Sequence, residues 1–195
     1  MASRLIRYCL IVLCLVGVWN LAIAGKFYAK AWLANQFIEH AWQTTLQGES
    51  KVRPWPWADT WPVAEIQIPR LDIRQLILSG DSGRVLAFGP GFTESSARPG
   101  ESGLSIISGH RDTSFSFLEE IHVGEQIIIK NAQDVTTYTV EELAIVDQRV
   151  FQIDDQIMKD QRASLLLVTC YPFDALRSGG NKRFLVLAKK VESGV

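Results

Sequence analysis

The sequence predicts a mostly β domain that follows a single N-terminal apolar helix. Many short apolar segments are separated by turns rich in glycine and proline, and this pattern favours a closed barrel or a sandwich of strands. One uninterrupted apolar stretch near the N-terminus is long enough to cross a membrane. The length of 195 residues allows one domain with an extension but not two ordinary domains.

The N-terminal apolar stretch covers residues 8–24, about the length of one membrane-spanning helix. Arg4 and Arg7 precede it without a nearby acidic residue, so the positive-inside rule places the N-terminus in the cytoplasm. Residues 22–24 form an A-x-A sequence, which is also how a cleavable signal peptide ends. We favour an uncleaved anchor because the apolar stretch is long for a signal peptide, and both interpretations export the domain.

A helix and an extended linker are predicted between this stretch and the β-rich part. Apolar residues recur at helical spacing within 26–47, so we expect a helix that packs on the domain. Residues 52–62 contain three prolines, which exclude a helix or a central strand. The predicted regions are therefore an anchor with its cytoplasmic tip (1–25), a helix with its linker (26–62) and a β domain (63–195).

Seven segments have the alternation or the short apolar run of a strand. They are residues 64–71, 72–80, 104–109, 125–131, 136–148, 164–170 and 183–191, of which 136–148 is either one long bent strand or two. Helical periodicity in this part is confined to 114–121 and, more weakly, to 154–160.

The charge and the cysteine count exclude several kinds of partner. The net charge is -1 and charged residues make up 21% of the chain, so no basic surface for nucleic acid is expected. Cys9, Cys14 and Cys170 form no C-x-x-C pair, and the three histidines complete no zinc pattern. Since only one cysteine lies outside the apolar stretch, we expect no disulfide within the domain. We also expect no cofactor.

Cys170 is the candidate nucleophile. It ends a strand where Tyr171 and Pro172 stop the hydrogen-bonded ladder, at the rim of the predicted fold. A buried structural cysteine is the alternative, but an unpaired thiol is a liability in an oxidising compartment. A catalytic thiol needs a partner, because a free thiol with a pKa of about 8.5 is mostly protonated at neutral pH.

A histidine is the expected partner of the thiol. His110 follows the strand at 104–109, again at a rim, and an imidazole there can accept or supply the proton. His122 is a weaker candidate, and His40 in the predicted helix is expected on a surface or in helix packing. Asp112 is a candidate for orienting a neighbouring group, although an exposed loop carboxylate is the common case.

An arginine is expected to stabilise the negative charge that develops during acyl transfer. The last two strands can form an antiparallel hairpin across the loop 171–181, which places the end of one beside the start of the other. Arg183 opens the second of these strands, so it is predicted to lie next to Cys170. Arg177 is nearer in the sequence, but its loop holds it less rigidly, and we therefore favour Arg183.

These residues resemble the catalytic residues of the sortases, a family of membrane-anchored cysteine transpeptidases. The segment Leu166-Leu167-Val168-Thr169-Cys170 is similar to the family's T-L-x-T-C motif, with leucine in place of the first threonine. The histidine that follows I-S-G and the arginine that opens the strand after the cysteine also fit the family. The resemblance covers about residues 63–191, and the segments W-P-V-A-E-I-Q-I-P-R-L and L-A-F-G-P-G look like its proteobacterial branch.

The resemblance implies a closed β-barrel of about eight strands with short helices, preceded by an N-terminal transmembrane helix. It implies that Cys170 cleaves a C-terminal sorting signal of an exported protein and forms a thioacyl intermediate. His110 would act as general acid and base, Arg183 would hold the substrate and stabilise the oxyanion, and Thr169 would shape the pocket or serve the fold. An amine acceptor in the cell envelope would complete the reaction on the outer side of the inner membrane.

Three other functions remain open at this point. An L,D-transpeptidase is disfavoured, since it carries its cysteine in an S-x-G-C motif that V-T-C-Y-P lacks. A membrane-anchored cysteine endopeptidase would use the same residues and pass the acyl group to water. A membrane-tethered β-barrel that only binds partners would leave Cys170 inert.

Overall fold

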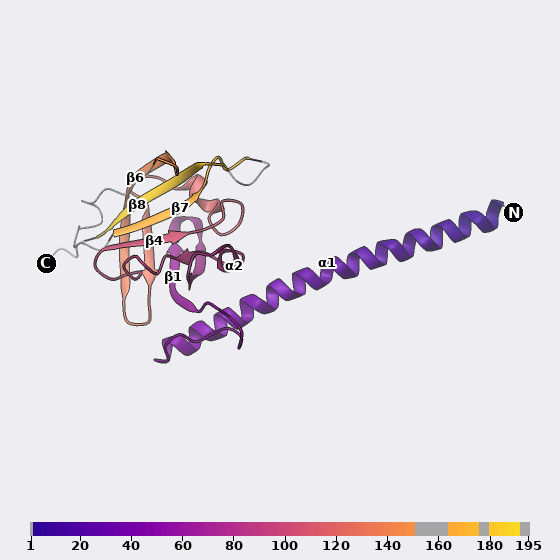
Figure 1. Ribbon diagram of the computed structural model, residues 1–195, viewed down its shortest axis with the longest axis horizontal. Coiled ribbons are helices and arrows are strands. Elements are labelled where there is room, and N and C mark those ends of the chain that lie inside the picture. Colours follow the sequence, from indigo (N-terminus) through magenta and orange to yellow (C-terminus); the bar gives the residue numbers. More distant parts are fainter. Residues whose placement is uncertain (1, 151–163, 176–179, 192–195) are drawn as a thin grey trace. The chain divides into compact units, whose positions relative to one another are not determined.

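The computed structural model describes residues 2–150, 164–175 and 180–191, and its strands close into one barrel (Figure 1). Around the barrel the strands follow the order β1-β2-β3-β4-β7-β8-β6-β5. In chain order they are β1 (Pro62–Ile68), β2 (Ile73–Ser79), β3 (Gly91–Phe92), β4 (Leu104–Ser108), β5 (Gln126–Lys130), β6 (Val135–Asp147), β7 (Ser164–Cys170) and β8 (Lys182–Lys190). The predicted closed barrel of about eight strands is confirmed, and closure leaves no open sheet edge among the strands of the described residues.

Each of the seven segments predicted as strands overlaps one observed strand, with boundaries that differ by up to a few residues. The segment 136–148 is a single strand, β6, whose register shifts between Val140 and Glu142. The sequence does not predict β3, because two residues are too few for a periodic pattern. Gly91 is needed in β3, since a Cβ there would lie 2.3 Å from the backbone oxygen of Gly80.

The short helices differ in detail from the prediction. The segment 114–121 contains a 3-10 helix, η2 (Ser116–Glu120), in place of an α-helix. Two further short helices, η1 (Pro69–Leu71) and α2 (Gly83–Leu86), carry no helical periodicity that the sequence could reveal, because each is about one turn long. The segment 154–160 lies outside the described residues.

α1 (Ala2–Leu46) is one continuous helix that contains most of the helix predicted at 26–47 (Figure 1). Its N-terminal part has the length and the apolar composition of one membrane span. Contacts within the chain divide it into two units after Phe37, so the last turns of α1 belong to the unit of the barrel. Ile38 and Trp42 of these turns are buried, as the predicted packing requires.

Arg74 forms two ion pairs, one within the barrel and one that joins the barrel to these last turns of α1. Arg74 of β2 lies 2.6 Å from a carboxylate oxygen of Glu65 in β1 and 3.2 Å from one of Glu39 in α1. The hydrogen bond from Arg74 lowers the pKa of the Glu39 carboxyl. The side chain of Glu65 is only 4% exposed, so Arg74 supplies the opposite charge that a buried carboxylate needs.

Side chains of β4, β7 and β8 pack on both faces of the sheet. Leu165, Leu167 and Val186 point into the barrel core and are fully buried. Leu166 and Leu185 belong instead to a second apolar cluster with Leu104, which we call the outer apolar row. Burial on both faces explains why β7 is a continuous apolar run and not an alternating one, and it makes these strands a rigid support for residues at their ends.

Candidate active site

Cys170 and Arg183 lie opposite each other at one end of the hairpin formed by β7 and β8. The two strands are antiparallel, and their register pairs the last residue of β7 with the second residue of β8. The next residue, Tyr171, continues the ladder when its N–H donates to the oxygen of Lys182 at 3.1 Å. The neighbouring positions that the sequence predicts for Cys170 and Arg183 are therefore found.

His110 reaches the same end of the sheet from the other side of β7. β4 and β7 run parallel, with Ser108 opposite Val168. The ladder extends past the end of β4, because the N–H of Gly109 donates to the oxygen of Val168 at 3.1 Å. This register brings His110, the following residue, level with Cys170 on the adjacent strand.

The three side chains belong to the outer face of the barrel. The outer apolar row includes Leu166 of β7 and Leu185 of β8, so the two-residue alternation directs Cys170 and Arg183 to the same side. The alternation along β4 extends to His110. Cys170 and Arg183 are partly buried and His110 is exposed, so a thiol, an imidazole and a guanidinium share this face at the ends of three adjacent strands.

The turn that carries His110 is shaped by a close contact between Gly109 and Phe115. A Cβ at position 109 would lie 2.6 Å from the ring of Phe115, which is fully buried. The backbone then reverses, and the oxygen of His110 accepts a hydrogen bond from the N–H of Phe115 at 2.8 Å. Glycine is required because this approach leaves no room for a side chain, and the sequence gives no direct sign that Phe115 is the partner.

Thr169 ties the turn of His110 to the strand of Cys170. Its hydroxyl donates to the backbone oxygen of Gly109 at 2.8 Å, and its surface is only 2% exposed. The hydroxyl points into the barrel, on the opposite face from the thiol. Of the two roles considered from the sequence, the structural one fits this geometry, because a buried hydroxyl with a backbone partner holds two strand ends together.

The guanidinium of Arg183 contacts the backbone of the loop that precedes it. Its Nη1 donates to the oxygen of Gly180 at 2.7 Å and to the oxygen of Lys182 at 2.9 Å. An arginine carries five N–H donors, and in the described part of the chain those on Nε and Nη2 have no hydrogen-bond partner. Arg183 is thus held in place while several of its donors remain available to a ligand.

Three aromatic rings pack together beside this site. Tyr171 and Phe173 follow Cys170, and both rings contact the ring of Phe184 in β8, with centroids 6.4 and 5.4 Å away. Ring contacts of this kind stabilise a turn beyond the effect of buried area. They order the first residues after Cys170.

The other histidines and the acidic candidate lie away from these contacts. Nδ1 of His122 is 3.5 Å from Arg70, in the turn before β5, so this imidazole is not at the ends of β4, β7 and β8. His40 is exposed on α1. The carboxylate of Asp112 is exposed and makes no hydrogen bond or ion pair with any residue that the structure describes. Arg177 lies outside the described residues.

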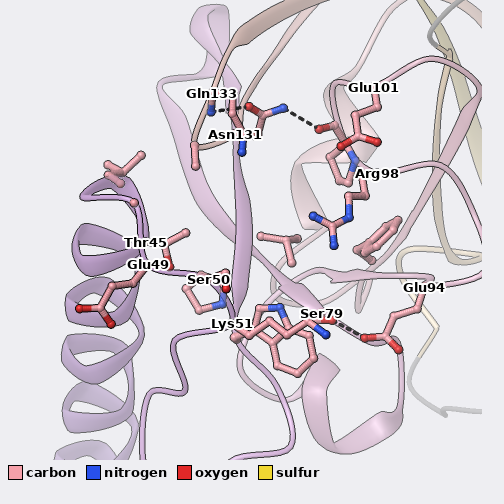
Figure 2. A pocket seen from close by; sticks show the side chains of 18 residues that line it. Thr45, Glu49, Ser50, Lys51, Ser79, Glu94, Arg98, Glu101, Asn131 and Gln133 are labelled. Atoms are coloured by element: carbon pink, nitrogen blue, oxygen red, sulfur yellow. Dashed lines mark hydrogen bonds between the residues drawn. The ribbon is translucent and has the colours of Figure 1, made fainter.

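One surface pocket among the described residues is separate from the candidate site. It has a volume of about 680 Å³ and lies between the segment Thr45–Lys51 and loops that carry Glu94, Arg98 and Asn131 (Figure 2). Neither the thiol, nor the imidazole of His110, nor the guanidinium of Arg183 lines it. Within the described ranges no group of three histidine, cysteine or acidic side chains is placed to hold a metal ion.

The sequence analysis does not single out Arg111, which directly follows His110. The residue is buried, and its Nη2 donates to the backbone oxygen of Ala175 at 2.9 Å. The sequence could suggest this contact only through the position of Arg111 next to His110, because the partner is a main-chain oxygen, which any residue type can supply.

Comparison with known proteins finds one matching family model, a relative similar in sequence and solved structures with a similar fold. A family model described as "Sortase domain" matches residues 66–191. Sortase D of Bacillus subtilis (strain 168) is 30% identical over 126 residues, which cover 65% of this chain and 62% of that protein. The match thus spans less than two thirds of that relative's length.

Two solved structures show the similarity of the fold. A sortase D5 transpeptidase of Clostridium perfringens has a TM-score of 0.59 and 24% identity, over 79% of this chain and 89% of that one. A sortase C of Clostridium perfringens, solved with the C-terminal cell wall sorting motif, has a TM-score of 0.59 and 21% identity. It covers 84% of this chain and 90% of its own.

Proposed function

Because this chain belongs to the sortase family, we propose that it is a cysteine transpeptidase that cleaves a sorting signal and transfers the acyl group to an amine. One observation carries the proposal. Cys170 and Arg183 are paired across β7 and β8, and the parallel register of β4 brings His110 level with the thiol on the same outer face. These are the groups that acyl transfer needs: a nucleophile, a proton carrier and a donor for the oxyanion.

In the first half of the reaction, the thiol proton of Cys170 passes to the imidazole of His110, and the resulting thiolate Sγ attacks the carbonyl carbon of the scissile peptide bond. The carbonyl oxygen becomes an oxyanion, and the free N–H groups of Arg183 donate to it. The C–N bond then breaks as the imidazolium of His110 gives a proton to the leaving amine. A thioacyl enzyme and a released C-terminal fragment are the products of this half.

In the second half, the acceptor amine loses its proton to the now neutral imidazole of His110 and attacks the thioester carbon. Arg183 again stabilises the oxyanion, and the C–S bond breaks to release the thiolate of Cys170. The new amide bond preserves the energy of the bond that was cleaved. Water in place of the amine would give hydrolysis by the same residues.

The proposed location is the inner membrane, with the catalytic domain outside the cytoplasm. It is supported by the apolar N-terminal part of α1 and by Arg4 and Arg7 before it. The proposed partners are an exported protein that ends in a sorting signal and an amine of the cell envelope. Membership of the proteobacterial branch is also a proposal and rests on the segments W-P-V-A-E-I-Q-I-P-R-L and L-A-F-G-P-G.

The full-length chain in detergent, mixed with peptides that carry sorting motifs, tests the activity. Cys170→Ala is expected to abolish cleavage and leave the folded domain intact, and His110→Ala and Arg183→Ala are expected to reduce turnover by about 100-fold or more. Arg177→Ala is the matched control and should retain turnover. Equal losses at the two arginines would contradict the assignment of Arg183.

Product analysis separates the transpeptidase from its two rivals. An added amine such as triglycine is expected to appear in an amide product, whereas an endopeptidase gives the free acid with or without the amine. Alkylation of Cys170, measured by mass spectrometry, separates both enzymes from a binding domain. A folded protein whose Cys170 thiol is not alkylated at any pH tested would contradict the catalytic proposal.

A further inference from the structure

We infer that Arg111 is a positioning residue, which holds the turn carrying His110 against the turn that follows Cys170. The inference rests on the proposed function, because it assigns a role within that active site. Arg111 directly follows His110 in the chain, and only 9% of its surface is exposed. Arginine is rarely buried without a partner, and its Nη2 donates to the oxygen of Ala175 at 2.9 Å.

The partner of Arg111 belongs to the segment that emerges from β7 directly after Cys170. Ala175 sits in a turn, since its N–H approaches the oxygen of Pro172 at 3.5 Å. The bond therefore connects two turns that lie 64 residues apart in the sequence. Each of these turns begins at a residue of the proposed catalytic pair, so the bond limits the movement of one relative to the other.

His110 is held on both sides, by one link to the strand of the nucleophile and by one link to the turn that follows this strand. On one side, the hydroxyl of Thr169 donates to the oxygen of Gly109 at 2.8 Å. On the other side, Arg111 donates to Ala175. The residue between these two links has little freedom to shift its backbone along β7. This matters because a displacement of about 1 Å between reacting groups can cost about 100-fold in rate.

The loop between β7 and β8 is held at both of its described ends by an arginine. Arg111 contacts Ala175 near its start, and Nη1 of Arg183 contacts Gly180 near its end. The two guanidinium groups differ in exposure: that of Arg111 is buried, and that of Arg183 is partly open to a ligand. A direct contact with substrate is the other role open to a cation here, and burial against a main-chain oxygen argues against it for Arg111.

The pH dependence of alkylation at Cys170 is the primary test, because it reports the coupling of thiol and imidazole without any substrate. Iodoacetamide is added to the full-length chain in detergent, and the Cys170 peptide is followed by mass spectrometry. His110→Ala is expected to change the pH profile of alkylation, because it removes the imidazole that lies level with the thiol on the adjacent strand. Arg111→Met is expected to change the profile in the same direction, and Arg111→Lys, which keeps a donor and the charge, to restore most of the wild-type profile.

Arg98→Met is the matched control, since Arg98 is an exposed arginine that lines the separate pocket. Its profile should equal that of the wild type. If Arg111→Met does not fold, as judged by thermal unfolding, Arg111→Gln takes its place, because the amide keeps most of the volume. A profile of the folded methionine or glutamine variant that superimposes on the wild type would overturn the inference.

Peptide cleavage provides the second measurement. Arg111→Met is expected to lower kcat by about 10- to 100-fold, the equivalent of one charge-assisted hydrogen bond, with KM changed less than about twofold. Arg111→Met could also lose kcat because less of the protein is folded. In that case the pH profile of alkylation of the folded molecules would stay unchanged, and this combination of results would count against the inference.

The two measurements also separate this inference from the proposed function. A profile that depends on His110 and Arg111 in a protein that processes no sorting peptide supports the positioning role and contradicts the function. Cleavage with a profile insensitive to Arg111 supports the function and contradicts the positioning role.

Discussion

Replacement of Gly109 by alanine is expected to destabilise the domain through a clash with Phe115. The added Cβ would lie 2.6, 2.7 and 2.9 Å from three atoms of the ring, which is fully buried and packs edge-on against Phe117. The ring cannot move aside without displacing other core residues, because the interior is close-packed. Insertion of a methyl group into such a core costs about 1–3 kcal/mol.

Urea unfolding of the full-length chain in detergent, followed by tryptophan fluorescence, measures this loss. In a domain of this size each kcal/mol also lowers the Tm by about 2–4 °C. Gly83→Ala is the matched control, since no atom lies within 4 Å of a Cβ built there. Its stability should stay within about 0.5 kcal/mol of the wild type.

A double-mutant cycle identifies the ring of Phe115 as the cause. Phe115→Ala removes the ring and is itself expected to cost about 3–5 kcal/mol. In that background Gly109→Ala should cost much less than it does alone, because the clash no longer exists. Additive losses, or a Gly109→Ala protein as stable as the wild type, would refute the reasoning.

Three further predictions concern single side chains, and urea titration of each variant checks them. Thr169→Val should cost about 1–3 kcal/mol, because a buried carbonyl at the end of β4 loses its donor; an unchanged midpoint would count against that bond. Arg74→Met should cost about 1–3 kcal/mol by leaving Glu65 without its charge partner, whereas Arg84→Met, at an exposed ion pair, should change stability by less than about 0.5 kcal/mol. Burial raises the pKa of Tyr138 to about 12, so the contribution of its neutral form to the free energy of unfolding is complete below about pH 10 and is lost as the pH rises toward 12. Tyr138→Phe should therefore reduce the loss of stability at alkaline pH. An identical dependence of stability on pH in the two proteins would contradict this prediction.

Much of the fold follows from local patterns. The strands that become β1, β2, β4, β5, β6, β7 and β8 each carry an apolar run or an alternation that is visible in the sequence. β3 is missed because its two residues are placed by the close approach of Gly91 to Gly80, which is a tertiary contact. The helix predicted at 114–121 is a 3-10 helix, since its apolar residues serve the core near Phe115 and not an amphipathic helical face.

The candidate site divides in the same way. The adjacency of Cys170 and Arg183 could be predicted, because a hairpin brings the ends of consecutive strands together. The position of His110 beside Cys170 could not be predicted, because it depends on the parallel register of β4 and β7. Parallel neighbours are joined by long connections whose length does not define the register.

The sequence by itself determined which residues have the chemistry and which elements carry them. A lone thiol at a strand end, a histidine after another strand and an arginine at the start of a third are local facts of residue type and periodicity. Only the tertiary structure decided how these strand ends are held together. The hydroxyl of Thr169 and the guanidinium of Arg111 bind main-chain oxygens 60 and 64 residues away. Every residue has such an oxygen, so no sequence pattern marks the partner, and only the folded chain selects it.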